Sequence, residues 1–501
     1  MRTGQRLELG AVSLLTVGVY VLLYLVQVQF FDHGLAASVP FVWPRTDVDP
    51  QQVQRNLSAY LLLVGISCVL YTWVLFRVSN WRGGFMTALL LGVPAVLHIL
   101  ALPTRPTLSM DAYSYLAHGY LAAHPPLNPY VQEASAVAAY PYGESLRQLG
   151  WLPLHAQSPY GPLWTQLERL VVMSTGPDAD TGQVLIKVPV VAATWGSAML
   201  IFALVRRLVP QLRWTAIAGW LWSPISLVEL GGDGHIDAVM IFLVLLACYA
   251  GVRGWGYLTT VALGLAVAVK YLPAVLAPPL LGMVWRQADS RAGVVVKIAC
   301  GGVTLLALLA LAFAPFWVGG PTFVGARESG RLYRSWSPSG LLLTLVGARV
   351  ADPAAERITQ ALLVSVLIII VLLVSTRIAG PRQMLRGVAV IACASFALLP
   401  GGWPWYAALP FALVLCLPTF GAQILVIVLT ATTRSIAAFG DLQMLGQVPY
   451  ADTVDIDGLV GVTIPGLCSV IGAIILWWRE PASAGVAEVP SQPSAQLRPQ
   501  D

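Results

Sequence analysis

Apolar stretches alternate with short polar connections along almost the whole of this 501-residue chain. Several of them, such as 9–31, 298–318 and 459–478, exceed the roughly 18 residues that mark a membrane-spanning helix. Lipid offers backbone N–H and C=O groups no hydrogen-bonding partners, so each stretch should be helical. The pattern predicts an all-α polytopic membrane protein with about 12–14 transmembrane helices. The expected spans are 9–31, 57–76, 86–103, 182–205, 214–231, 236–252, 255–270, 272–285, 298–318, 357–376, 387–400, 405–418, 421–438 and 458–478.

Lysine and arginine are distributed unevenly over the connections, and membrane proteins retain such residues in their cytoplasmic loops. If Arg2 and Arg6 are cytoplasmic, the arginine-rich connections 206–213 and 377–386 are cytoplasmic too. The predicted location is therefore the cell (inner or plasma) membrane, with the remaining long connections facing the periplasmic side. These outer segments are 32–56, 104–181, 319–356 and 439–457.

The composition agrees with this picture and excludes some classes of function. Of all residues, 57% are apolar and only 11% are charged, against about 25% charged in soluble domains. The net charge of +5 is mild, and no interleaving of basic and aromatic residues indicates a nucleic-acid partner. The six cysteines lie in apolar segments without a CxxC pair, so we interpret them as packing residues.

Residues 1–479 are predicted to form a single transmembrane domain, and the Pro-, Ser-, Ala- and Gln-rich tail 480–501 to be disordered in the cytoplasm. The longest connection, 104–181, is too polar to span a membrane but rich in Tyr, Trp, Pro and His. Loops of that length in compact proteins are usually functional. We expect this first large outer loop to carry short interfacial helices, and 319–356 to be a second outer loop.

The first candidate site follows the third expected span, in Asp111-Ala-Tyr113-Ser-Tyr115-Leu-Ala-His118. In a helix, Asp111, Tyr115 and His118 would share one face. The carboxylate could take a proton from a hydroxyl nucleophile, and the rings could stack on sugar faces. Alternatively, Asp111 merely caps the helix, with Ser109 as a competing cap.

Two motifs fixed by proline follow in the same loop, Asn128-Pro-Tyr130 and Ser158-Pro-Tyr160-Gly-Pro. Such backbones hold polar groups in set positions, which suits substrate binding, although turn formation alone would also explain them. Glu168 and Arg169 are expected on a surface helix that begins near Pro162.

A glycine-rich turn, Gly231-Gly-Asp233-Gly-His235-Ile-Asp237, joins the fifth expected span to the sixth. In one interpretation, Asp233 caps the sixth helix and Asp237 interacts with its dipole. In the other, His235 and the helix N-terminus face a phosphate group. The spacing of Asp233, His235 and Asp237 also suits a metal ion, but a fourth ligand is lacking in sequence, and we predict no metal.

Several cations lie where a phosphate could meet them. Lys270 ends an apolar run, and a charge at membrane depth indicates function, with snorkelling to the interface as the alternative. Snorkelling is expected for Lys187. Arg327, Arg331 and Arg334 lie within eight residues of the second outer loop, where positive charge should be rare. Arginine binds phosphate in a bidentate manner, although anionic lipid headgroups would also explain this cluster.

The turn after Gly401 contains Trp403 and Tyr406, which could form an interfacial aromatic belt or a platform for a sugar. The candidates together predict one outer-face pocket with a carboxylate, stacking aromatics and cations for a phosphate leaving group. The chain has no Walker A motif or dinucleotide fingerprint, so a soluble nucleotide donor is not indicated. We expect no cofactor.

These motifs, in this order, resemble those of the actinobacterial polyprenol-phosphomannose-dependent α-1,6-mannosyltransferases, which are GT-C type glycosyltransferases. The resemblance rests on Asp-x-Tyr-x-Tyr, Asn-Pro-Tyr, Ser-Pro-Tyr-Gly-Pro-Leu, Gly-x-Asp-Gly-His-x-Asp and Lys-Tyr-x-Pro, and covers roughly residues 10–480. It implies a GT-C-like fold and transfer of mannose from polyprenyl phosphomannose to a mannose hydroxyl of a lipomannan-type glycolipid. The linkage would be α-1,6, formed with inversion.

The resemblance also implies roles for individual residues. Asp111 matches the family's acidic residue after an early span and would be the general base. The residues expected to bind the sugar substrates are Tyr113, Tyr115, His118, Asn128, Tyr130, Ser158, Tyr160, Trp403 and Tyr406. Those expected to bind the donor phosphate are His235, Lys270, Arg331 and Arg334.

Two alternatives remain open. A transporter or flippase of a lipid-linked sugar would use the same pocket without breaking a bond. Many transporters have two related halves with broken helices near the midplane, whereas this sequence shows no convincing internal repeat, which favours an enzyme. Among enzymes, a GT-C enzyme with a different sugar or acceptor would leave the same pattern.

Overall fold

The computed structural model describes residues 3–32, 50–81, 83–106, 109, 111–149, 151, 157–330, 337–400, 403–417, 420–433 and 464–478. Within these ranges the chain forms helices, turns and bends only, which confirms the all-α prediction. Two of the predicted phosphate-binding residues, Arg331 and Arg334, lie outside the described residues, as does the tail 480–501.

Six of the described helices are long and apolar enough to cross a membrane. They are α1 (Thr3–Asp32), α2 (Pro50–Arg77), α3 (Gly84–Ala101), α7 (Ala179–Leu208), α12 (Arg291–Phe313) and α15 (Ala354–Thr376). Apolar side chains project outward from them: Leu306 and Leu311 of α12 are 67% and 72% exposed, and Leu372 of α15 is 57% exposed. Such a surface is stable against lipid and unstable against water. Helix length, hydropathy and surface therefore identify a multi-pass membrane protein.

A further candidate span is broken. The helix α8 (Arg213–Leu221) gives way to the π-helix η4 (Ile225–Gly232), and α9 (Asp237–Val252) is bent by 118° relative to η4. Taken as one span, η4 and α9 would be the seventh. The continuous span expected over 214–231 is interrupted because Pro224 lacks the N–H that would extend α8. π-Helical turns often occur at functional sites.

The remaining helices of the apolar region are shorter. They are α10 (Gly256–Val269), η5 (Leu272–Leu276), α11 (Ala277–Arg286), α14 (Pro338–Gly347), α16 (Pro381–Leu398), η7 (Pro404–Ala407), α17 (Ala408–Leu415), α18 (Phe420–Thr433) and α21 (Ile464–Trp478). Each of the remaining expected spans coincides with one or two of them. The apolar helix α14 lies instead within 319–356, beside η6 (Gly320–Phe323) and α13 (Val324–Ser329). All six cysteines are free, as expected, but only Cys248, Cys393 and Cys416 are buried as packing residues, and Cys300 is exposed.

The first large loop, 104–181, contains short helices, as predicted. They are α4 (Asp111–Ala123), η2 (Ala134–Ala139), α5 (Pro141–Gln148) and α6 (Pro162–Thr175). The expectation that Glu168 lies on the surface is wrong, because its side chain is fully buried where α6 packs against α4. Burial raises the pKa of Glu168 well above its ordinary value, which favours the neutral acid.

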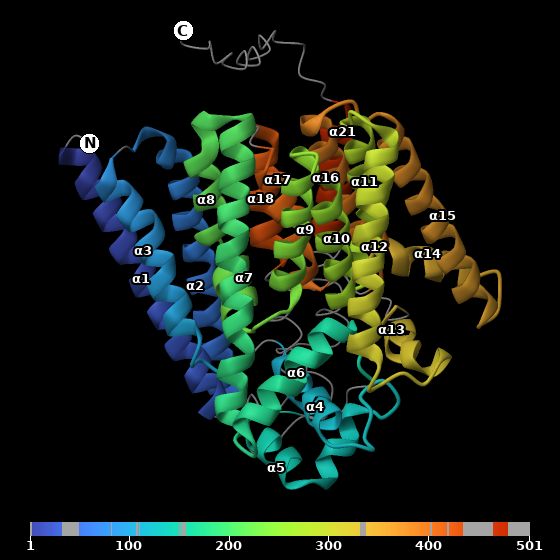
Figure 1. The fold of residues 1–501 in the computed structure, drawn as a ribbon. Coiled ribbons are helices and arrows are strands. Elements are labelled where there is room, and N and C mark those ends of the chain that lie inside the picture. Colours follow the sequence, from blue (N-terminus) through green and yellow to red (C-terminus); the bar gives the residue numbers. More distant parts are fainter. Residues whose placement is uncertain are drawn as a thin grey trace, which may run out of the picture.

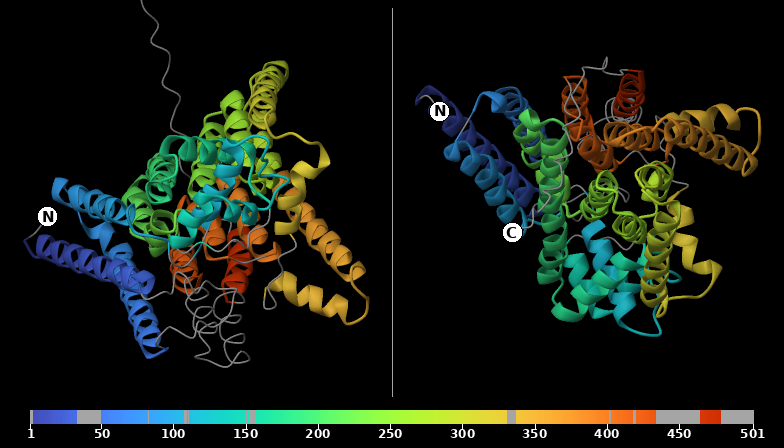
Figure 2. Two further views of the ribbon diagram at one scale, coloured as in Figure 1. Left: turned by 90° about the horizontal axis from the view of Figure 1, so that it is seen from below. Right: turned by 45° about the horizontal axis from the view of Figure 1, so that its top comes forward.

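The helices surround a buried centre (Figures 1 and 2). The helices α1, α2 and α3 pack together on one side, and α14 and α15 lie on the opposite side. Between them are α7, α9, α10, α16 and α17. The loop helices α4, α5 and α6 lie at the end of the molecule opposite the start of α1 (Figure 1). The loop therefore covers one end of the central helices.

The start of α6 is fixed to the end of α10 by a close approach of two backbones. Gly161 donates its N–H to the carbonyl of Val269 at 2.9 Å, and a Cβ at Gly161 would collide with the backbone of Ala268. We expect Gly161→Ala to lower stability by about 1–3 kcal/mol through overpacking and hence to lower the Tm of the purified protein. Gly282→Ala in α11 is the matched control, because its Cβ would enter open space. Equal Tm values for the two variants would contradict this account of loop docking.

Candidate active site

Asp111 is the first residue of α4 and the acidic residue of its first turn. The hydroxyl of Ser109 accepts the Asp111 N–H at 3.2 Å, and capping by Asp111 stays an alternative to a catalytic role. The Tyr115 hydroxyl lies 3.5 Å from Asp111 Oδ2, as expected for residues one turn apart. The Asp111 side chain keeps 21% of its surface exposed, which makes the carboxylate reachable from outside.

Aromatic rings form a wall beside this carboxylate. The Tyr115 ring packs edge-to-face against Tyr160 and Trp164, each at 5.2 Å between centroids, and His118 lies 6.3 Å from Tyr160. Burial raises the pKa of Tyr160, and the Asp111 carboxylate raises it further. The Tyr160 hydroxyl therefore stays protonated. The structure brings Tyr115, Tyr160 and His118 together, with Tyr115 in contact with Asp111.

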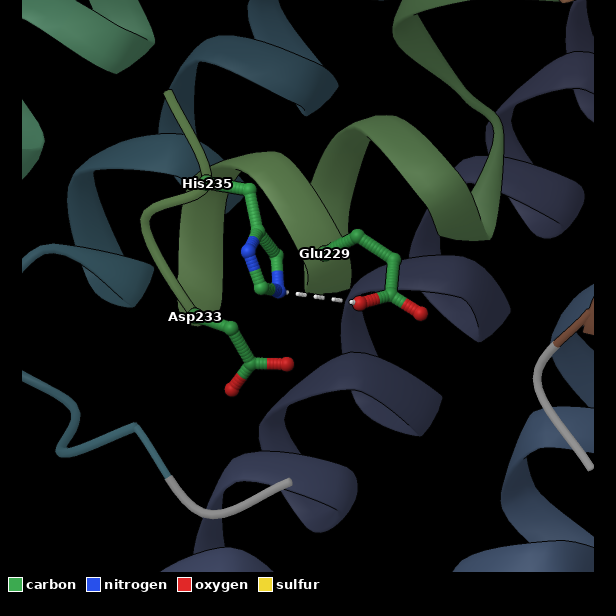
Figure 3. A group of neighbouring side chains, drawn as sticks. All are labelled: Glu229, Asp233 and His235. Carbon is green, nitrogen blue, oxygen red and sulfur yellow. Dashed lines mark ion pairs between the residues drawn. The ribbon is translucent and has the colours of Figure 1, made fainter. Parts of the chain in front are cut away.

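The turn after η4 places His235 against Asp111. Gly234 has a φ of 77°, a left-handed conformation that favours glycine. The His235 Nδ1 atom lies 3.4 Å from Asp111 Oδ2. Its Nε2 atom lies 3.5 Å from Glu229 Oε2, the ion pair drawn in Figure 3. The idea that Asp233 caps α9 is wrong, because the N-cap is Ile236 and no side chain caps that helix. A phosphate-binding role for His235 stays a prediction, and it would act through charge, since both ring nitrogens face carboxylates.

Lys270, at the end of α10, forms a buried ion pair with the first residue of α9. Its Nζ lies 2.9 and 3.0 Å from the two carboxylate oxygens of Asp237, and 4.0 Å from the centre of the Tyr406 ring. The Lys270 side chain is 16% exposed and that of Asp237 is 4% exposed. Asp111 is near enough to interact with Lys270 electrostatically. The predicted residues Lys270 and Tyr406 therefore share one site with Asp111.

Two tryptophan rings form a stack with the imidazole of His235. The Trp405 ring stacks on His235 with centroids 3.9 Å apart and planes 16° apart, and Trp403 stacks on Trp405 at 5.1 Å. The turn before η7 is thereby joined to the turn before α9. The predicted residue Trp403 reaches the site through Trp405.

Lys187 does not snorkel to the interface, contrary to expectation. Its side chain is fully buried in α7, and its Nζ donates to the carbonyls of Ala101 at 3.0 Å, Gly232 at 3.1 Å and Thr104. Carbonyls at helix ends lack intrahelical partners, which explains why they attract the ammonium. Lys187 thus ties the end of α3 to the end of η4, and so fixes the segments that precede Asp111 and His235.

Asn128 and Tyr130 stabilise the loop. The Asn128 side chain donates to the Phe316 carbonyl at 2.9 Å and accepts the Tyr130 N–H at 3.0 Å. The Tyr130 ring is fully buried beside Phe316, and its hydroxyl lies 2.9 Å from that of Thr165. These contacts match the turn-forming alternative for the Asn-Pro-Tyr motif.

Ser158 and Tyr113 are likewise buried. The Ser158 hydroxyl accepts the Tyr160 N–H at 3.4 Å, which is a turn contact. Tyr113 is 1% exposed. None of the hydrogen bonds described for Tyr113, Ser158 or the Asn-Pro-Tyr motif includes Asp111. A role for these residues in substrate binding stays a prediction.

Sequence reasoning missed Glu229 and did not include Trp405 among the site residues. Glu229 is 1% exposed inside an apolar segment, and a lone carboxylate at membrane depth was a signal in its own right. Ligand atoms of Glu229, Asp233 and His235, all buried, lie within 4.8 Å of one another (Figure 3). These three residues could hold a metal ion. The set considered from sequence included Asp237 in place of Glu229, but Asp237 is paired with Lys270. The absence of a catalytic metal stays a prediction.

The site combines a reachable carboxylate, Asp111, with the largely buried side chains of Lys270 and His235. Asp111 is 21% exposed, against 2% for the Glu229 side chain and 4% for that of Asp237, so Asp111 is the most accessible of these carboxylates. A hydroxyl group could give its proton to Asp111. Lys270 and His235 could then stabilise negative charge that develops close by.

Comparison with known proteins gives concordant results. A family model described as "Alpha-(1->6)-mannopyranosyltransferase, N-terminal domain" matches residues 16–287, which is more than half of the chain. A model of glycosyltransferase family 87, a GT-C family, matches residues 182–400. The Alpha-(1->6)-mannopyranosyltransferase A of Mycobacterium tuberculosis (strain ATCC 25618 / H37Rv) is 27% identical over 266 residues, which are 51% of this chain and 49% of that protein. The match thus spans about half the length of that relative.

Proposed function

The chain belongs to the α-(1→6)-mannopyranosyltransferase family, and we propose that it transfers mannose from polyprenyl phosphomannose to a mannose hydroxyl of a lipomannan-type glycolipid. The product would carry an α-1,6 linkage. The observation that carries the proposal is the reachable Asp111 carboxylate beside the buried Lys270 and His235. An acceptor hydroxyl needs a base, and a departing lipid phosphate needs positive charge.

The proposed reaction is a single displacement with inversion. The C6 hydroxyl oxygen of the acceptor attacks C1 of the β-linked donor mannose while its proton passes to Asp111. The bond between C1 and the phosphate oxygen breaks, and its electron pair leaves with the polyprenyl phosphate. General-base help is worth about 10²–10⁴-fold. The charge of Lys270 and His235 favours the leaving phosphate, a role that we also assign to Arg331 and Arg334.

The aromatic wall supports a place for the sugars. We propose that Tyr115, His118 and Tyr160 bind one face of the mannose units, and that Trp403 and Tyr406 bound the other side. Tyr160, Trp403 and Tyr406 are partly exposed, so a sugar can reach their faces, whereas Tyr115 and His118 are buried and would have to be uncovered when the sugar binds. Asn128, Tyr130, Ser158 and Tyr113 would then support the loop that holds this wall.

We further propose that residues 1–479 act as one membrane domain with the site facing the periplasmic side. The loop helices lie at the end opposite the start of α1 (Figure 1). Arg77 pairs with Glu8, near the start of α1, at 2.7 Å. Positive charge at that end agrees with a cytoplasmic location, which would leave α4 and α6 outside.

A direct assay tests this function. Purified protein in nanodiscs is incubated with polyprenyl phosphomannose and an α-1,6-linked dimannoside, with and without EDTA. We expect a trisaccharide whose new linkage is α-1,6, formed equally in EDTA. Absence of product, together with movement of the lipid across a vesicle bilayer, would replace the enzyme by a transporter. A product with another linkage would indicate a GT-C enzyme with a different acceptor.

A further inference from the structure

Glu229 is a buried acid with no assigned role in the displacement. It lies in the π-helix η4, within an otherwise apolar segment, and is 1% exposed. An ionised carboxylate in such surroundings is unfavourable by several kcal/mol unless it is paired. Its contacts should therefore explain why the chain carries an acid at this position.

The pairing leads from Glu229 to the proposed base. The Glu229 Oε2 atom is 3.5 Å from Nε2 of His235, and the opposite ring nitrogen, Nδ1, is 3.4 Å from Asp111 Oδ2. Trp405 covers one face of the imidazole at 3.9 Å. Neither ring nitrogen forms a hydrogen bond with the described residues, so the two carboxylates and the Trp405 ring orient the imidazole through charge and stacking. Figure 3 shows the Glu229 carboxylate and the His235 ring, from opposite sides of the turn, meeting at Nε2.

Both distances are longer than the 2.7–3.2 Å of a strong N–H···O bond. Contacts between catalytic groups are often long without substrate and shorten when the reacting complex forms. A relay in which a carboxylate orients an imidazole, which in turn orients the reacting group, is a known way of fixing geometry at an active site. Here the last group in the relay would be the carboxylate of Asp111.

We propose that Glu229 is a positioning residue, which holds the His235 imidazole so that Nδ1 fixes the direction of the Asp111 carboxylate. The proposal rests on the proposed function, because it assigns Asp111 as the base. Glu229 does not touch the substrate in this scheme. Its effect reaches the reaction only through His235 and Asp111.

Other charges surround the relay and must be considered in any test. Asp233 lies in the turn before His235, with a carboxylate oxygen within 4.8 Å of the facing atoms of Glu229 and His235. Lys187 interacts electrostatically with Asp233 and packs against Gly234. If a cation bound Glu229, Asp233 and His235 together, Glu229 would be a metal ligand and not a positioning residue. The experiment therefore includes a metal arm.

The test is a double-mutant cycle on the transfer rate in nanodiscs. Glu229→Gln keeps the size and a hydrogen-bonding atom but removes the charge, and we expect a kcat about 10²-fold lower, the size of effect that misplacement of a reacting group produces. The donor KM should be unchanged. In the Asp111→Asn background, Glu229→Gln should slow the residual reaction less than twofold, because residues that act as one unit are strongly non-additive.

His98→Asn is the matched structural control. His98 contacts the same π-helix from outside the relay, with Nε2 3.3 Å from the Ser226 carbonyl. We expect this variant to lower the Tm of the protein. Its effect on the rate should multiply with that of Asp111→Asn, as for independent sites.

Three results would overturn the proposal. The first is a Glu229→Gln effect that multiplies with Asp111→Asn, as His98→Asn is expected to do. The second is a rise in donor KM with unchanged kcat. The third is wild-type activity that is lost in EDTA and restored by Mn²⁺, which would make Glu229 a metal ligand.

A measurement without turnover separates this proposal from the proposed function. In protein labelled with ¹⁵N-histidine, the His235 ring signals are assigned with a His235→Asn variant. We expect Glu229→Gln to shift them and His98→Asn to leave them in place. Unshifted signals would overturn the positioning role. A shift in a protein that transfers no mannose would refute the proposed function while leaving the relay intact.

Discussion

Asp111→Asn is expected to lower the kcat of mannosyl transfer by about 10²–10⁴-fold, the contribution of a positioned general base. Asparagine has nearly the same shape as aspartate, but its neutral amide cannot act as a general base. The donor KM should change little, because Lys270 and not Asp111 is assigned to the phosphate. The rate is measured with radiolabelled polyprenyl phosphomannose, and donor affinity by calorimetry on the same nanodisc preparation.

The control for this variant is Asp180→Asn. Asp180 belongs to the same outer segment, is 61% exposed, and forms a surface pair with Arg105 at 3.5 Å. Pairs of this kind contribute little to stability, so both the Tm and the transfer rate should equal those of the wild type. If Asp111→Asn kept more than a tenth of the wild-type rate with an unchanged Tm, another group would have to be the base.

The membrane helices could be predicted from sequence because lipid imposes one requirement on every span. A continuous apolar run of sufficient length has to be helical, and the helices α3, α7 and α15 follow the expected ranges closely. The interruption between α8 and η4 was not expected. Apolar residues continue through Pro224, and hydropathy does not record a missing backbone donor.

The site could be predicted only in part. Contacts between residues close in the sequence could be predicted, whereas contacts between distant residues could not. Asp111 and Tyr115 lie one turn apart, so a helical pattern is enough to bring them together. Asp111, His235 and Trp405 lie far apart in the sequence, and only tertiary packing brings their side chains together. Lys187 was misjudged for the same reason, since the carbonyls that hold it belong to α3 and η4.

Lys270→Met is the second variant with a large expected effect, and it should impair both folding and donor binding. The Lys270 ammonium has three protons and directs two of them to Asp237, at 2.9 and 3.0 Å. The third can meet a phosphate oxygen in the open part of the site, because the Lys270 side chain is 16% exposed. A hydrogen bond to a charged group is worth about 1.5–3 kcal/mol, so the donor KM should rise about 10–100-fold.

The same change leaves Asp237 buried without a counter-charge. Breaking one side of a buried pair costs about 3–5 kcal/mol, so the Tm should fall together with donor affinity. The two effects must be separated before the lysine is assigned to the phosphate. The double variant Lys270→Met, Asp237→Asn provides the separation, because it removes both charges at once.

In the double variant, most of the lost Tm should return, since no uncompensated charge remains, whereas the donor KM should stay raised. The single variant Asp237→Asn should have a lowered Tm and a donor KM that is not raised, because it keeps the ammonium that faces the phosphate. A double variant that regains both stability and donor affinity would limit Lys270 to a structural pair between α9 and α10. The double variant and the Asp237→Asn variant should differ because a single ammonium group, that of Lys270, neutralises both the Asp237 carboxylate and the leaving phosphate in the proposed reaction.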